Sequence, residues 1–257
     1  MDTRMTAKVN RERVLLAGGQ RALVMQLAHP LVAAGVAHHS DFPARALDRL
    51  RRTLDLSLAL IYGTEAEAHD ASEAIRAVHD RVAGEAEGRR YSANDPELLV
   101  WVNATLIDTT LAVYERFVGP LTEEERAGYY RETVAAAEGF GIPGAHIPAD
   151  LRAFRSYLRG MLDGPELRAT DASRRLVRDV LRPPLPLPLR LPTVVLRQVT
   201  VALLPPRIRE MFDLRHGLTS KVTLAATATA SRLTLPWLPP ILRDFSRARA
   251  AATARPE

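Results

Sequence analysis

The chain has no cysteine among its 257 residues. Disulfide frameworks, thiolate nucleophiles, iron–sulfur clusters and cysteine zinc sites are therefore excluded together. Any metal must be held by histidine, by carboxylates or through a cofactor. With 47% hydrophobic residues, the chain is that of a globular protein and is long enough to bury one large core or two modest ones.

Lysine is almost as scarce as cysteine. Lys8 and Lys221 are the only lysines, so arginine carries nearly all of the positive charge behind the formal net charge of +5. These arginines are scattered among acidic residues and form no clustered basic stretch. This pattern argues against nucleic acid as a partner.

Long uninterrupted apolar runs are also absent. The first residues lack an apolar run of signal-peptide length, which predicts a cytoplasmic protein. The most apolar region, residues 185–205, is broken by Arg190, Arg197 and several prolines, so it is a poor transmembrane candidate. We expect its leucines and valines to pack onto the domain, and peripheral membrane contact is the less favoured alternative.

Strand patterns are scarce, because apolar residues recur at three and four positions instead of alternating. The sequence predicts an all-α protein with helices over about 10–28, 43–62, 64–82, 95–118, 122–139, 149–162, 171–181, 193–203, 206–213, 218–234 and 239–250. Without a repeat or a change in composition, residues 1–257 are expected to form one domain. Its core would span about 10–182, followed by a proline-rich extended spacer at 183–192 and C-terminal helices at 193–250.

Three helix starts have clear capping signals. Each has an oxygen-bearing cap followed by a residue suited to the first turn, namely Thr64 with Glu67, Asp95 with Pro96, and Thr122 with Glu125. Gly119 and Pro120 end the second of these helices, which should be the longest and most central one.

His79 lies near the end of the helix that Thr64 caps. Ile75, Val78 and Val82 form an apolar stripe, and His79 shares that face. An imidazole on an apolar face needs partners for its ring nitrogens. Periodicity alone favours a core histidine bonded to a backbone carbonyl or a carboxylate. A metal or haem ligand is the functional alternative.

Arg49, Arg52 and Thr53 follow helical spacing in "RLRRTLDLSLALIYG". Two guanidiniums and a hydroxyl beside apolar surface suit an anionic group such as a carboxylate or a haem propionate. Taken alone, a solvated basic face is the simpler interpretation.

Three further histidines, His29, His38 and His39, lie in "QLAHPLVAAGVAHHSDF". Adjacent histidines point in different directions on a helix, so His38 and His39 cannot both face one ion from a regular helix. The sequence also lacks an HExxH motif. We therefore expect these histidines to pack or to bond locally.

The order of several motifs, however, resembles a known family. "AHPLVAAGVAHHSDF", "RLRRTLDLSLALIYG", "AVHDRVAG", "YSANDPELLVWVNATLID", "LTEEERAGYYRE" and the late "VTVALLPPRIREMFDL" together resemble the rubber oxygenase (latex clearing protein) and mycophenolic-acid oxygenase (MpaB-like) family. The resemblance covers about residues 10–215. It implies an all-helical, globin-reminiscent fold that binds a b-type haem and members that cleave isoprenoid double bonds with dioxygen.

Carried over residue by residue, the resemblance implies that His79 in "HDRVAG" is the proximal ligand of the haem iron. It implies that Arg49, Arg52 and Thr53 form the distal signature of the rubber oxygenases. Arg49 and Thr53 would act on dioxygen or position the substrate, and Arg49 or Arg52 could instead bind a haem propionate. We expect His79 to donate its second ring N–H to a carbonyl or a carboxylate.

Two positions depart from the family pattern. Arg52 replaces a lysine, and a guanidinium stays protonated, so it is a poor ligand for the sixth position of iron. Asn103 stands where many relatives are expected to carry histidine, so it can form hydrogen bonds but cannot titrate near neutral pH.

The resemblance thus implies a haem-dependent oxygenase acting on an apolar alkene or isoprenoid-like small molecule, with dioxygen as co-substrate. Two other classes remain open at this stage. One is a haem-binding sensor or carrier that turns nothing over. The other is a haem-free helical interaction protein in which His79 is a core residue.

Overall fold

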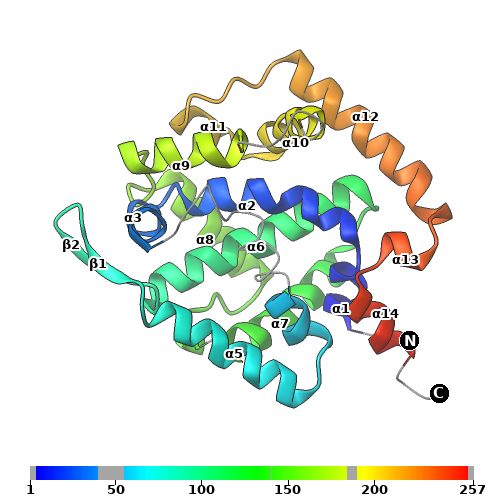
Figure 1. Cartoon of the computed structure of the whole chain (residues 1–257), viewed down its shortest axis with the longest axis horizontal. Helices are drawn as coiled ribbons and strands as arrows, with labels where there is room; N and C mark the ends of the chain where they lie inside the picture. Colours follow the sequence, from blue (N-terminus) through cyan, green and yellow to red (C-terminus); the bar gives the residue numbers. More distant parts are fainter. Residues whose placement is uncertain (1–3, 40–54, 140, 184–189, 254–257) are drawn as a thin grey trace.

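A computed structural model describes residues 4–39, 55–139, 141–183 and 190–253 (Figure 1). In these ranges the chain forms one mostly helical domain, as the sequence predicts, with a single small hairpin. The part of the predicted 43–62 helix that is described, residues 55–62, is helical. No helix in the described part is both long enough and apolar enough to cross a bilayer.

The N-terminal third is more divided than the sequence predicts. Instead of one helix over 10–28, the structure has α1 (Met5–Asn10), a 3-10 turn η1 (Arg13–Gly18), α2 (Gly19–Gln26) and α3 (Pro30–His39). A Cβ at Gly18 would lie 2.6 Å from Thr109 Cγ2, so the glycine allows η1 to approach the central helix closely. Pro30 starts α3, a first-turn position that proline tolerates.

The longest described helix is α6 (Pro96–Phe117), and it lies at the centre of the molecule (Figure 1). Its start is as predicted, because the Asp95 carboxylate accepts a hydrogen bond from the N–H of Glu97 and Pro96 opens the first turn. The helix contacts α1, η1, α2, α7 (Glu123–Gly139) and α12 (Leu218–Thr234). It therefore fixes the relative positions of the N-terminal and C-terminal helices.

The other two predicted caps are also present. Thr64 and Glu67 exchange hydrogen bonds at the start of α5 (Glu65–His79), and Thr122 and Glu125 do the same before α7. After α7 come η2 (Gly144–His146), α8 (Leu151–Asp163) and α9 (Asp171–Leu181).

A hairpin that the sequence analysis did not predict joins α5 to α6. It pairs β1 (Ala83–Ala86) with β2 (Arg89–Ser92) in antiparallel register. Glu87 and Gly88 form its two-residue turn with φ of 55° and 69°, which is the left-handed geometry of a tight hairpin. The predicted 64–82 helix ends three residues early for this reason, because Val82 already accepts a backbone hydrogen bond from Ala93.

The C-terminal helices differ from the expected boundaries in two places. α10 (Arg190–Leu203) already includes residues 190–192, which were expected to belong to the extended spacer. α11 (Pro206–Met211) and α12 follow as predicted, but the expected 239–250 helix is replaced by η4 (Leu235–Trp237), α13 (Pro240–Arg243) and α14 (Ser246–Thr253). Extended backbone at Asp244 divides the last two helices.

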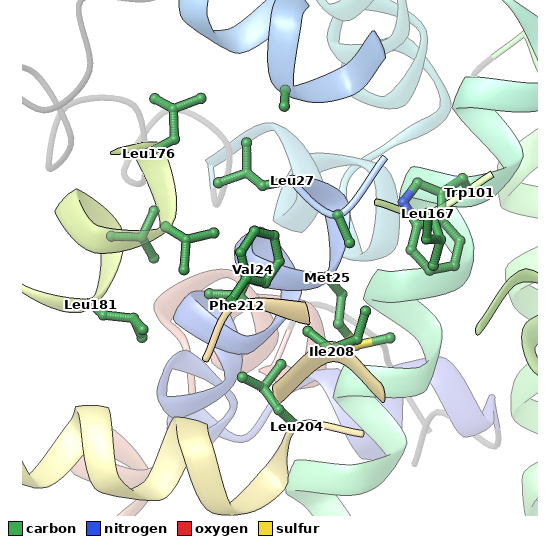
Figure 2. Packing of buried hydrophobic residues seen from close by; sticks show 14 residues of the cluster. Val24, Met25, Leu27, Trp101, Leu167, Leu176, Leu181, Leu204, Ile208 and Phe212 are labelled. Atoms are coloured by element: carbon green, nitrogen blue, oxygen red, sulfur yellow. The ribbon is translucent and has the colours of Figure 1, made fainter. Parts of the chain in front are cut away.

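The largest hydrophobic cluster gathers side chains from widely separated parts of the chain (Figure 2). The cluster joins Val24 and Met25 of α2 to Trp101 of α6, Ile208 of α11 and Phe212. Trp101 and Ile208 are fully buried. This packing holds the N-terminal and C-terminal helices against α6.

Candidate functional site

His79 is the last residue of α5, and its position is fixed by contacts to the start of α6. Next to it, the Asp80 carboxylate accepts a hydrogen bond of 2.7 Å from the Asn94 amide, directly before the Asp95 cap. Val82 accepts the backbone hydrogen bond from Ala93. The end of α5 is therefore held at the N-terminal end of the central helix.

The imidazole of His79 is half-buried and makes no hydrogen bond to a described residue. Burial lowers the pKa of His79, and the nearby Asp80 carboxylate opposes this only in part. The ring is therefore neutral near pH 7, which is the form that can donate a lone pair to a metal. The expected partner for its second ring N–H is not found among the described residues.

The neighbours of His79 only partly match the predicted apolar stripe. Ile75 is half-buried, and Val82 packs into a small cluster with Tyr91 and Leu98. Val78, in contrast, is 48% exposed. One side of the end of α5 thus packs against the hairpin, and the other side is exposed to solvent. His79 therefore does not have the environment of a fully packed core histidine.

A second open feature lies on α6. Leu106 is 45% exposed although it lies midway along the central helix, and Asn103, on the same face, is only half-buried. The Asn103 amide makes no hydrogen bond to a described residue. These two side chains lie about 10–15 Å along α6 from the junction that holds His79, calculated from the helical rise. The sequence analysis did not single out Leu106, because only the packing shows which apolar position stays open.

The distal half of the expected site lies in a part of the chain outside the described residues. Arg49, Arg52 and Thr53 lie outside the described residues, within 40–54. The described part of the chain has no group of three or more histidine or carboxylate side chains positioned to share one metal ion. Of the predicted site, the structure therefore describes His79 and Asn103.

Each of the three N-terminal histidines has a hydrogen-bond partner in the protein, but only that of His29 is local in sequence. The His29 ring accepts a hydrogen bond from the N–H of Leu31, His38 lies 2.9 Å from the Tyr91 hydroxyl, and His39 lies 3.0 Å from the carbonyl oxygen of Ala83. His38 and His39 therefore link α3 to the hairpin.

The described residues also line two surface cavities. One of about 490 Å³ lies between α6, α10 and α12, and one of about 180 Å³ lies beside His29 and the hairpin turn. His79 lines neither of them.

The half-buried position of His29 predicts a loss of stability in mild acid. Burial, together with Arg89, lowers the pKa of His29 from 6.5 to about 4. Between these two pKa values, His29 is protonated in the unfolded chain but not in the folded protein. The free energy of unfolding should therefore fall as the pH drops from about 6.5 to about 4, by about 2 kcal/mol after allowance for partial exposure.

Urea unfolding at a series of pH values measures the slope of the free energy of unfolding against pH. His29→Gln should flatten it, because glutamine does not titrate, whereas the exposed His69→Gln should leave it unchanged. Equal slopes for the wild type and His29→Gln would assign the acid sensitivity to other groups.

Comparison with known proteins gives one family match. The family model described as "ER-bound oxygenase mpaB/B'/Rubber oxygenase, catalytic domain" matches residues 7–233. Two uncharacterized proteins, Rv2237 of Mycobacterium tuberculosis and Mb2261 of Mycobacterium bovis, are each 28% identical over 152 residues. That stretch is 57% of this chain and 60% of each of these relatives. No solved structure matches the chain significantly.

Proposed function

We propose, since this chain belongs to the catalytic-domain family of the ER-bound oxygenase mpaB and the rubber oxygenases, that it is a b-type haem-dependent oxygenase. Its substrate would be an apolar alkene or isoprenoid-like molecule, which it oxidises or cleaves with dioxygen. The observation that carries the proposal is the half-buried His79 imidazole, which has no hydrogen-bond partner among the described residues and lies where the end of α5 is held against the start of α6.

The described residues fit haem better than a metal ion bound by protein ligands alone. Haem iron needs only one imidazole from the protein, and His79 would hold it. Leu106 and Asn103 leave part of the central helix open to a large planar group with apolar faces. When bound, haem supplies the iron that activates dioxygen.

The side chains of this protein would then orient the reactants and exclude water. We assign Arg49 and Thr53 to hydrogen bonding with dioxygen or the substrate, and Arg49 or Arg52 to the haem propionates, on the sequence motif alone. Asn103 can donate or accept a hydrogen bond but cannot move a proton near neutral pH.

Reconstitution with haem tests this proposal. We expect the purified chain to bind haem at one per protein and to develop a Soret band. With a reductant, dioxygen and an isoprenoid alkene, cleavage of a C=C bond by one O₂ should yield two carbonyl products. Failure to bind haem would favour the alternative of a haem-free helical interaction protein. Haem binding without any product from the alkenes supplied would favour a haem-binding sensor or carrier.

Arg52 provides a spectroscopic prediction. Because a protonated guanidinium cannot occupy the sixth position, the ferric wild type should be mainly high-spin and should bind added cyanide or imidazole readily. Arg52→Lys introduces an amine whose pKa falls on burial, so this variant should shift toward a low-spin spectrum as the pH rises.

Arg51→Lys is the matched control, since it makes the same exchange one residue earlier. A low-spin wild type that resists cyanide would mean that another side chain closes the site. His38 and His29 would then be the first candidates to replace by alanine.

A further inference from the structure

The C-terminal helix α12 has apolar side chains on two faces. Its inner face packs Leu224 and Ala228 against Val199 of α10 and Phe117 of α6. The Ser220 hydroxyl donates to the Gln198 side-chain oxygen at 2.6 Å, and the Ser231 hydroxyl donates to the Phe117 carbonyl at 2.9 Å. These contacts hold the inner face of α12 against α6 and α10.

The outer face of α12 is largely apolar as well. Leu218, Val222 and Leu233 are 76%, 56% and 67% exposed, and the exposed Ala225 and Thr229 lie between them at helical spacing. We call these five residues the outer stripe, in which the threonine hydroxyl is the one polar side-chain group. It runs for about 22 Å, calculated from the helical rise. A helix on the surface of a globular protein normally turns polar residues outward, so this stripe indicates a contact with something apolar.

The exposed apolar surface continues in the chain beyond α12. Trp237 of η4 is 87% exposed, and Ile241 and Leu242 of α13 are 62% and 57% exposed. Figure 1 shows α12 along one outer edge of the molecule, and the chain passes from it through η4 to α13. Tryptophan with leucine and isoleucine at a surface is typical of the interface between water and lipid.

The chain that carries the outer stripe has charged side chains of one sign. Residues 214–243 contain no aspartate or glutamate. Lys221 and Arg232 lie on α12 and line the 490 Å³ cavity together with Arg116 of α6. The one carboxylate lining this cavity, Glu115, is paired with Arg126 at 2.6 Å. Lys221 and Arg116 form no ion pair with a described residue.

We infer that α12, η4 and α13 form a docking surface for an anionic phospholipid bilayer. The outer stripe and Trp237 would enter the interfacial layer, while Lys221 and Arg116 would contact the lipid phosphates. A second copy of this chain is less suitable as the occupant, because its own α12 offers no carboxylate to these cations. The inference uses no property of the His79 site and stands apart from the proposed function.

Vesicle sedimentation with the full chain tests the docking surface. The protein should sediment with vesicles of phosphatidylcholine and phosphatidylglycerol in equal parts, weakly with pure phosphatidylcholine vesicles, and less as the salt concentration rises. The exposed Trp237 should give a blue-shifted emission on binding, since Trp101, the other tryptophan, is already fully buried.

Two variants separate the apolar and the charged contributions. Val222→Gln should weaken the partition to anionic vesicles at least fivefold, because it removes buried apolar area. Its matched control is Val78→Gln, a similarly exposed helical valine on α5, which should bind like the wild type. Lys221→Gln should weaken binding about fivefold on anionic vesicles and leave binding to neutral ones unchanged.

The inference is wrong if the wild type does not sediment with anionic vesicles at low salt, or if Val222→Gln and Val78→Gln bind equally well. Light scattering after size-exclusion chromatography tests the alternative that a second copy of this chain binds the outer stripe. A wild-type dimer that Val222→Gln converts to a monomer would assign the outer stripe to contact between two copies.

Discussion

His79→Ala should leave the protein folded but unable to retain haem. The change removes the one described imidazole that is neutral, half-buried and without a partner at the proposed site. Alanine is a better helix former than histidine, so α5 should persist. Because changes to outer-shell partners alone weaken metal binding by about 10–100-fold, loss of the ligand itself should lower haem affinity by more than about a hundredfold. Soret titration with added haem measures this, and far-UV circular dichroism monitors the fold.

Two further variants make the result specific. His69→Ala changes an exposed histidine on the same helix and should bind haem like the wild type. His79→Gly opens space for a free imidazole, so added imidazole should restore the Soret band in that variant alone. Full haem occupancy with an unchanged spectrum in His79→Ala would overturn the ligand assignment.

The helix starts could be predicted from the sequence because their causes are local. Thr64 and Thr122 each exchange hydrogen bonds with a residue three positions later, and Asp95 caps a helix that Pro96 opens. Such signals need no partner from elsewhere in the chain. Family membership and the all-helical class were likewise predicted correctly, because the motifs are distributed along most of the chain.

The hairpin could not be predicted for the opposite reason. Its turn needs positive φ at Glu87 as well as at Gly88, and glutamate does not normally indicate that conformation. Its strands are mostly exposed and short, so they lack an alternating pattern, and Tyr91 is their one fully buried side chain. What holds the hairpin is tertiary, since His38 lies against the Tyr91 hydroxyl and His39 against the carbonyl of Ala83.

Periodicity was also an incomplete guide to which apolar side chains are covered. The expectation that residues 185–205 pack onto the domain is wrong for Leu191, Val194 and Val195, which are 78%, 50% and 43% exposed. It holds further along α10, where Val199 is buried against α12. The burial of an apolar residue depends on whether another element reaches it, which a single sequence does not specify.

The sequence was likewise only a partial guide to the candidate site. Periodicity places His79 on a face with Ile75 and Val82 and so favours a packed core residue, whereas the structure leaves its ring without a partner among the described residues. The resemblance to the family gave the haem-ligand hypothesis. The roles of Arg49, Arg52 and Thr53 stay predictions from the motif.

Arg21→Met should be among the most destabilising single changes in the described part of the protein. The Arg21 side chain is 5% exposed and joins three helices. Its guanidinium donates to the Asp108 carboxylate at 2.6 Å, to the Thr109 hydroxyl at 2.6 Å and to the Leu203 carbonyl at 2.9 Å. Removing it leaves a buried carbonyl and hydroxyl without a donor and a carboxylate without its counter-charge.

Removing one partner of a buried ion pair costs about 3–5 kcal/mol of stability. The lower end of this range applies here, because the Asp108 side chain is 25% exposed and water can hydrate it. For a chain of this length, about 3 kcal/mol lowers Tm by about 6–12 °C. Calorimetry should show this loss for Arg21→Met and a smaller one for Arg21→Lys, which keeps the charge but not the planar three-way fork. Arg159→Met, on an exposed position of α8, makes the same substitution and should shift Tm by less than about 2 °C. Equal Tm values for the two methionine variants would mean that α2, α6 and α10 are held together by apolar packing alone.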